Sequence, residues 1–161
     1  MPKMIVKISS VYDASVDEMW RELQKLSTLQ YIASPFASFT PLENDIVWRE
    51  GHTAQFKLKL FGFISFGIHT IKIIECDEKT LTVYTNESNK SVPIWNHKIS
   101  LQPNKDNTVK YTDNVEINAG WKTIFVYCWS VMFYKHRQKK WKKLLKSIHL
   151  ESIENTEKYS R

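Results

Sequence analysis

Residues that interrupt or cross-link a chain are scarce in this sequence of 161 residues, which has four glycines, five prolines and two cysteines. So little glycine and proline argues against a disordered or low-complexity chain. Neither Cys76 nor Cys128 has a CxxC partner or a neighbouring metal ligand. We therefore expect two free thiols, no bound metal, and an intracellular protein.

Long hydrophobic runs are also missing. The first ten residues, MPKMIVKISS, lack the apolar region of a signal peptide. The longest apolar run, IFVYCWSVMFY at 124–134, is far shorter than the roughly 20 residues that a membrane span needs. Neither GxGxxG nor GxxxxGK[ST] occurs, so no phosphate-binding loop is predicted. We expect a cytoplasmic protein without a cofactor.

Aromatic rings are abundant, and positive charge is concentrated in one place. Phe, Trp and Tyr make up 13% of the chain, and such rings either fill cores or line cavities for apolar ligands. The segment 135–146, KHRQKKWKKLLK, holds seven of the 23 Lys and Arg residues and no acid. The rest of the chain is close to neutral, so attraction to anions would come from this segment.

Hydrophobic periodicity predicts an α+β order of elements. Residues 3–9 alternate as a half-buried strand. The stretch SVDE at 15–18 has the spacing of a capping box and predicts a helix to about Leu26. A second short helix is predicted around 28–33, ended by Pro35. From about 44, beginning with IVWRE, to 117, alternating segments separated by turn signals predict the antiparallel strands.

The last predicted element is a long helix over about 121–150. A sheet with one polar face needs a cover for its other face, and this helix is the natural cover. We expect one domain over residues 1–150 and a polar, fraying tail over 151–161. The predicted apolar face of the helix consists of Ile124, Cys128, Val131, Tyr134, Trp141, Leu145 and Ile148.

Several stretches together resemble a known family. They are ISSVYDASVDEMWREL, KLFGF, TNESNKSVPIWNHKISL, YTDNVEI and FYKHRQKKWKKLL. The chain resembles START-like, birch-allergen-like domains of the SRPBCC superfamily over roughly residues 3–148. It is most similar to bacterial single-domain members grouped with polyketide cyclase/dehydrase and lipid-transport proteins.

This resemblance implies a helix-grip fold, in which a curved seven-stranded antiparallel sheet wraps around the long C-terminal helix. It also implies a cavity for a hydrophobic molecule between sheet and helix. The superfamily has no universal catalytic motif, so the chemistry has to be argued from individual residues.

The hairpin at 94–117 places a histidine and a carboxylate on its inner face. His97 alternates in phase with Trp95 and Ile99, and Asp113 alternates in phase with Tyr111. If Ile99 lies opposite Tyr111, His97 lies directly opposite Asp113, where side chains are close enough for a hydrogen bond. We predict an inward-facing His97–Asp113 pair.

The same parity argument turns His69 and Glu87 inward. It assumes that Leu58 and Leu60 face inward and that their hairpin partners are the odd-numbered residues of 65–73, including Ser65 and Gly67. The next turn then places Glu87 beside His69. The strand around His69 is apolar on both faces, so its register is weakly specified.

Three interpretations of these polar groups stay open. They form a structural network that fixes the strand register, or they orient a polar group of a ligand, or His97 acts as a general base oriented by Asp113. His69, Glu87 and His97 have no short-spaced metal-ligand pair among them. Ser65, Ser100 and Cys128 are available as nucleophiles, but none lies in a nucleophile elbow.

The sequence favours a protein that binds a small hydrophobic or amphipathic ligand, lipid-like or polyketide-like. The alternatives are a cyclase, dehydratase or hydrolase using the His–Asp pair, and an interaction module whose own rings fill the core. We expect a monomer or homodimer, no nucleic-acid partner, and leave open a peripheral contact of segment 135–146 with anionic membranes. The predicted cavity walls are Phe56, Leu58, Trp95, Tyr111 and Trp129, and a helical stripe of Trp121, Phe125, Trp129 and Phe133 faces either the cavity or the first helices.

Overall fold

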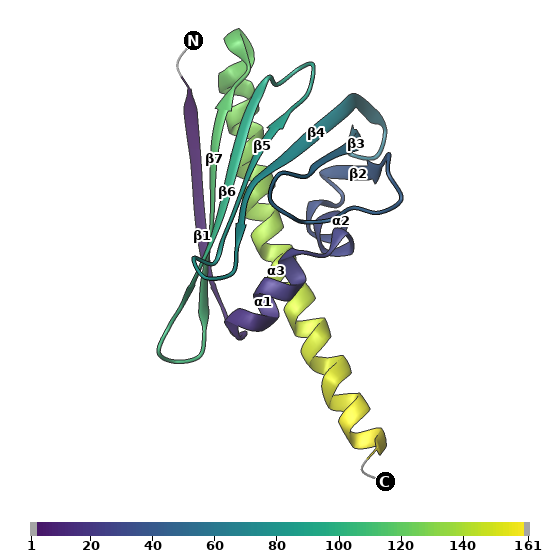
Figure 1. Cartoon of the computed structure of the whole chain (residues 1–161), viewed down its shortest axis with the longest axis vertical. Helices are drawn as coiled ribbons and strands as arrows, with labels where there is room; N and C mark the ends of the chain where they lie inside the picture. The colour runs from purple at the N-terminus through teal and green to yellow at the C-terminus, as the bar shows by residue number, and fades with distance from the viewer. Residues whose placement is uncertain (1–2, 160–161) are drawn as a thin grey trace.

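Residues 3–159, which the computed structural model describes, form a seven-stranded antiparallel sheet, two short helices and one long helix (Figure 1). This is the predicted α+β helix-grip fold, with both short helices following the first strand. The strands are β1 (Met4–Tyr12), β2 (Ala37–Pro41), β3 (Thr53–Leu60), β4 (Ile64–Asp77), β5 (Thr82–Ser88), β6 (Ile94–Pro103) and β7 (Val109–Asn118). The helices are α1 (Val16–Leu23), α2 (Leu26–Ala33), a 3-10 turn η1 (Gly120–Lys122) and α3 (Thr123–Tyr159).

The sheet has the order β1-β7-β6-β5-β4-β3-β2. From β2 to β7 each strand pairs with the next, and β1 pairs with β7. Because β1 and β2 are the two edges, α1 and α2 carry the chain from one edge to the other. α2 packs against both α3 and β2, and Figure 1 shows both short helices beside α3. The short helices therefore close one side of the space between the sheet and α3.

The first strand after α2 lies earlier than predicted. Residues 46–50 form no strand, whereas β2 forms over residues that the periodicity did not select. β2 pairs with β3 at the sheet edge, where Pro41 at its end is tolerated because the outer side needs no hydrogen-bond partner. The loop 46–50 still contributes Trp48, which is half-buried.

Helix α1 begins at the predicted cap, but only half of the capping box forms. The Ser15 hydroxyl accepts a hydrogen bond from the Glu18 backbone N–H at 3.2 Å. The Glu18 carboxylate instead contacts Nε2 of His149 at 3.0 Å. This contact joins α1 to α3, so a tertiary partner has replaced the local one.

The long helix α3 buries a face that differs from the predicted one. Ile124 is 50% exposed and Cys128 is also exposed, whereas Arg137 and Gln138 are buried. Each residue of an α-helix turns by about 100°, which places Ile124 and Cys128 roughly 80° and 120° away from Tyr134. Spacings of three, four and seven therefore included residues beyond the edge of the buried face.

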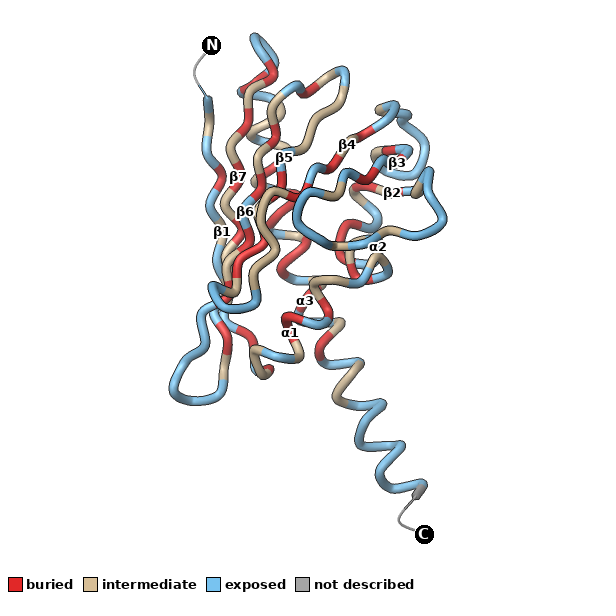
Figure 2. Tube along the Cα trace, in the orientation of Figure 1, coloured by how far each residue is buried: buried red, intermediate tan, exposed pale blue. Residues whose placement is uncertain are grey.

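The C-terminal tail is helical where it was expected to fray. α3 continues to Tyr159, and all side chains from 151 to 158 are exposed. Figures 1 and 2 show this end of α3 projecting from the rest of the molecule, with exposed residues along it. The last two residues of the predicted tail, 160–161, lie outside the described residues.

Two clusters of buried apolar side chains fill the space between the sheet and the helices. One includes Phe56, Trp95 and Tyr134, and the other includes Tyr111 and Trp141. Figure 2 shows the buried residues gathered along the sheet and the part of α3 that crosses it. The sheet and α3 thus share one continuous interior, in which the polar groups described next are embedded.

Candidate functional site

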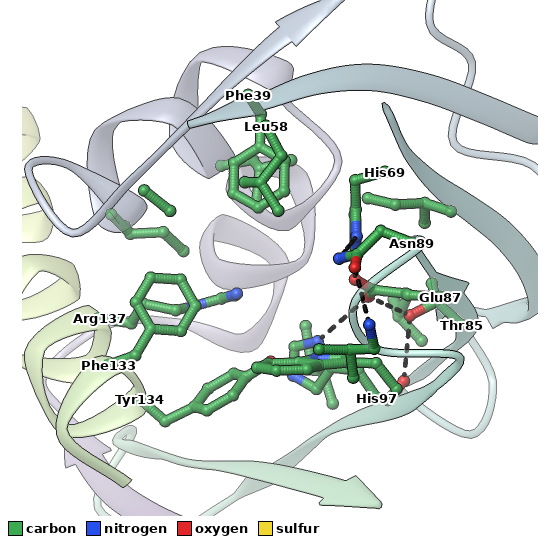
Figure 3. A pocket seen from close by; sticks show the side chains of 18 of the residues that line it. Phe39, Leu58, His69, Thr85, Glu87, Asn89, His97, Phe133, Tyr134 and Arg137 are labelled. Carbon is green, nitrogen blue, oxygen red and sulfur yellow. Dashed lines mark hydrogen bonds and ion pairs between the residues drawn. The ribbon is translucent and has the colours of Figure 1, made fainter. Parts of the chain in front are cut away.

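A cavity of about 300 Å³ lies between the sheet and the helices. Its lining comes from β2 to β6, the three α-helices and two loops, and is mostly apolar. Figure 3 shows Phe133 and Arg137 on the α3 side of this space and His69, Asn89 and Glu87 on the opposite side. Among the lining residues, Phe125 is exposed, at 68%. The arrangement is an apolar chamber with polar side chains on two facing walls.

Six of the nine predicted site residues line this cavity. They are Leu58, His69, Glu87, Trp95, His97 and Trp129. Phe56, Tyr111 and Asp113 do not line it and are fully buried. Tyr111 and Asp113 belong to β7, which lies on the far side of β6 from the cavity-lining strand β5. Their parity was read correctly, but parity does not say which strands surround the cavity.

The aromatic stripe at the start of α3 divides along its length. Phe125, Trp129 and Phe133 line the cavity, whereas Trp121 does not and is 68% exposed. The rings of Trp129 and Phe133 stack at 4.7 Å between centroids. The stripe therefore forms a wall of the cavity from the first turn of α3 onward.

The predicted register of the β6–β7 hairpin is wrong by two residues. Ile99 pairs with Asp113, and His97 pairs with Val115. The ladder extends to Pro103, so the connecting loop is shorter than the predicted pairing requires. A shift by an even number of residues keeps each side chain on its face. His97 and Asp113 therefore still meet, as diagonal neighbours.

The inward-facing pair itself is confirmed, with Nε2 of His97 2.7 Å from Oδ1 of Asp113. Oδ1 also accepts from the Tyr111 hydroxyl at 3.2 Å, and Oδ2 accepts from the Gln138 amide at 3.0 Å. Burial raises the pKa of Asp113, but the hydrogen bond from His97 and the charge of Arg137 outweigh it, so the pKa is lowered. Asp113 is a buried carboxylate with three donors.

His97 is held between two carboxylates. Besides its bond to Asp113, its Nδ1 lies 3.7 Å from Oε1 of Glu87. Burial lowers the pKa of His97, but the hydrogen bond to Asp113 and the nearby Glu87 carboxylate have the larger combined effect, and the pKa is raised above its ordinary value of 6.5. Protonated His97 thus bridges the two acids electrostatically.

Glu87 joins the second predicted histidine to this network. Its Oε2 lies 2.8 Å from Nε2 of His69, and its Oε1 accepts from the Thr85 hydroxyl at 2.7 Å. Burial alone raises the pKa of Glu87, but the hydrogen bond from His69 and the nearby His97 ring hold it well below its usual range. The Asn89 amide lies 3.2 Å from Nδ1 of His69. An amide nitrogen only donates, so Nδ1 accepts and Nε2–H points at Glu87.

The contact of His69 with Glu87 is as predicted, and His69, Ile71 and Gly67 pair with β3 as expected, although Glu87 is not the ladder partner of His69. Glu87 pairs with Ile71, one side-chain position from His69 on the same face. A bulge between Leu58 and Lys59 shifts the β3–β4 register. Gly67 pairs with Leu58 as expected and Ser65 follows the bulge, but both are exposed, and the even-numbered Phe66 between them lines the cavity instead.

Arg137 is the main site residue that the sequence interpretation missed. In the sequence it is one of the seven basic residues of 135–146, the segment expected to attract anions at the surface, yet it is 5% exposed and lines the cavity. Its Cζ lies 5.1 Å from the Tyr134 ring centroid and 5.6 Å from that of Phe133. The signal was present, since Arg137 follows Tyr134 by three residues and precedes Trp141 by four.

Metal binding and membrane crossing find no support in residues 3–159. No group of three His, Cys, Asp or Glu side chains in this range could hold a metal ion. No helix in the same range has an apolar stretch that would cross a membrane. The histidines and carboxylates near the cavity instead contact one another.

The seven-stranded sheet packed on a long C-terminal helix is the helix-grip fold of START-like proteins, as comparison with solved structures shows. A START superfamily protein from Mycobacterium smegmatis superposes with a TM-score of 0.69 at 11% identity, covering 89% of this chain and 98% of that one. Norcoclaurine synthase from Thalictrum flavum, solved with dopamine and hydroxybenzaldehyde, gives 0.66 at 11% identity, covering 91% and 88%. A protein from Chromobacterium violaceum gives 0.66 at 14% identity, covering 87% and 96%.

These similarities are structural, since no protein-family model and no curated protein matches the sequence significantly. At such low identity they establish the fold alone. This chain has the START-like helix-grip fold that the sequence resemblance implied.

Proposed function

We propose that this protein binds a small hydrophobic or amphipathic molecule in the cavity between the sheet and α3. The observation that carries the proposal is the cavity itself, about 300 Å³ with mostly apolar walls and a few polar side chains. Ligand pockets typically combine these features at volumes of roughly 300–1,000 Å³. An interaction module with a filled core would have no such space. The complex of norcoclaurine synthase with two aromatic compounds provides support from a protein of the same fold.

Binding is favoured over catalysis because three of the four ring nitrogens of the two histidines hold hydrogen bonds within the protein, and the fourth faces Glu87. His69 uses one ring nitrogen toward Glu87 and the other toward Asn89. His97 uses Nε2 toward Asp113 and has Nδ1 near Glu87. A general base needs a nitrogen within reach of the substrate proton. In this arrangement the histidines position the carboxylates and fix the register of the strands. Catalysis by a hydrolase or dehydratase is the second candidate function.

The proposal is tested with N-phenyl-1-naphthylamine, a neutral probe whose fluorescence rises when it leaves water. Val126 lines the cavity from α3 and is half-buried, so Val126→Trp places a large ring in the cavity. Met132 on the same helix is 55% exposed and does not line the cavity, so Met132→Trp is the matched control.

We expect saturable, stoichiometric binding by the wild-type protein and by Met132→Trp. Val126→Trp should weaken it by about tenfold or more, equivalent to about 1.4 kcal/mol. Absence of saturable binding to the wild type, or equal binding by both variants, would contradict a ligand site in this cavity. Mass spectrometry of the native protein as purified then identifies any molecule already bound.

A further inference from the structure

Every oxygen of the two carboxylates near the cavity already accepts a hydrogen bond from the protein. Both oxygens of Glu87 have partners, Thr85 on one and His69 on the other. Asp113 accepts on both oxygens as well, and it is 0% exposed. A bound cation or a donor-rich ligand would have to share these oxygens with the protein donors already on them. The acidic groups are therefore poor candidates for direct ligand contacts.

Hydrogen-bond donors that line the cavity are, by contrast, left without partners. Nε of Arg137, Nε1 of Trp129 and Nε1 of Trp48 are buried and have no hydrogen-bond partner among the described residues. A buried donor without a partner costs about 1–3 kcal/mol, and more if it is charged. The cavity thus presents unused donors, which a ligand with acceptor atoms would satisfy.

Arg137 is the most demanding of these donors because it carries a full charge. In residues 3–159 no carboxylate lies within ion-pair distance of it. Burial lowers its pKa, but the charge of Asp113 more than compensates, so the guanidinium stays protonated. Figure 3 shows its side chain beside the Phe133 ring, reaching from α3 toward the wall that holds Glu87. Tyr134 and Phe133 flank the guanidinium carbon and restrict where it can lie.

We infer that the ligand carries an anionic group, such as a carboxylate, which binds the guanidinium of Arg137. The planar fork of arginine matches a carboxylate, and in a buried site this pairing is strong. The ligand is then an amphipathic anion whose apolar body packs against Phe133 and the other rings. This inference rests on the proposed function and adds the chemical class of its ligand.

The indole N–H of Trp129 lies too far from Arg137 to bind the same part of the ligand. Trp129 and Arg137 are eight residues apart on α3, which corresponds to about 12 Å along the helix axis. Phe133 lies between them, stacked on Trp129 and beside Arg137. A ligand whose anion meets Arg137 therefore places its apolar body along Phe133 and its far end near Trp129.

The test compares decanoate with decan-1-ol as competitors that displace N-phenyl-1-naphthylamine at pH 7. The two molecules share an apolar chain of equal length and differ in the charge of the head group. Arg137→Met removes the charge but keeps a flexible apolar stem, and Arg137→Lys keeps the charge but removes the fork. Lys143→Met is the matched control, because Lys143 lies exposed on the same helix.

We expect wild-type protein and Lys143→Met to bind decanoate about tenfold more tightly than decan-1-ol. Arg137→Met should lose this preference while keeping its affinity for decan-1-ol, and Arg137→Lys should keep part of it. Equal affinities for the two competitors in wild-type protein would overturn the inference while leaving the proposed function intact, and this comparison needs no variant to fold. A preference that persists in folded Arg137→Met would overturn it too. Failure of the probe and both competitors to bind would instead refute the proposed function.

Discussion

At the residue scale, the ionisable groups of the interior form a chain from His69 through Glu87 and His97 to Asp113, and the Asn89 amide binds His69 at its start. Each link joins a donor to an acceptor, so no carboxylate of the chain is buried alone. A buried charge without a partner costs several kcal/mol. The chain therefore stabilises β4 to β7 in one register, and the structural interpretation of these residues holds beside any role toward a ligand.

Substitution of the innermost carboxylate should show this contribution. Asp113→Ala leaves protonated His97 without its partner at 2.7 Å and leaves the Gln138 amide without its acceptor. We expect the free energy of unfolding to fall by about 3 kcal/mol or more. Urea denaturation without ligand measures this loss. Asp45→Ala, at an exposed loop position, should change it by no more than about 0.5 kcal/mol. Similar effects of both substitutions would disprove a structural role of the pair.

The pKa shifts predict how stability depends on pH. His97 has a pKa raised above 6.5 in the folded protein, so its contribution is complete below pH 6.5 and is lost as pH rises through the raised value. Glu87 and Asp113 have pKa values lowered from 4.5 and 3.8. Their contributions are complete above those values and are lost as pH falls through the lower folded values. Stability should therefore be highest between about pH 4.5 and 6.5.

Thermal unfolding from pH 5.5 to 9 measures the alkaline half of this dependence. We expect the melting temperature of wild-type protein to decrease as pH rises above 6.5. His97→Gln should have a lower melting temperature and a flatter dependence on pH. Identical slopes for His97→Gln and the wild-type protein would contradict a raised pKa of His97.

At the element scale, the β6–β7 hairpin shows that the alternation of apolar and polar residues predicts the face of a side chain but not the register of the strands. The inner face was predicted correctly for His97 and Asp113, because the period of a strand is two. The register was wrong by two residues because both registers bury the same faces. The geometry of the loop and the neighbouring strands select one of the two registers. The alternation of residues carries no information about either.

Helix α3 shows a similar limit for charged residues. A run of seven basic residues suggests a solvated surface, yet Arg137 lies on the buried side. The spacing of Arg137 from Tyr134 and Trp141 indicates the buried face of the helix. The basic composition of the segment indicates a solvated surface, and the two signals disagree. Burial of an arginine depends on a cavity and on nearby acids from other strands, so only the assembled fold gives a reason for it.

The exposed end of α3 leads to our proposal that residues 1–150 fold as one domain without the tail. A chain ending at Leu150 loses, among the side chains whose burial is described, those from 151 to 158, and all of these are exposed. We expect its free energy of unfolding to change by less than about 1 kcal/mol. A chain ending at Leu144 also loses Leu145, which is 3% exposed, and should lose about 2–5 kcal/mol. Equal losses in urea denaturation would show that the tail contributes to the core.

At the scale of the whole molecule, the net charge of +6 has two separate components. The lysines of 135–146 are exposed or half-buried on α3, and Arg137 of the same segment points into the interior. The outer lysines are suited to anionic surfaces, so contact with an anionic membrane stays a prediction. Arg137 contacts only what enters the cavity. The segment 135–146 thus places positive charge both on the surface of the protein and in its interior.

The order of elements, the faces of β6 and β7, and the covering of the sheet by the last helix followed from the sequence, because local periodicity and turn chemistry encode them. The strand register, β2 and the extent of α3 did not follow, since pairing partners and edges select among locally equal choices. The tertiary structure alone decided that Asp113 lies behind the cavity wall while Arg137 lines it. The physical reason is that a cavity is enclosed by segments far apart in the chain, and the burial of a charge depends on what those segments place around it.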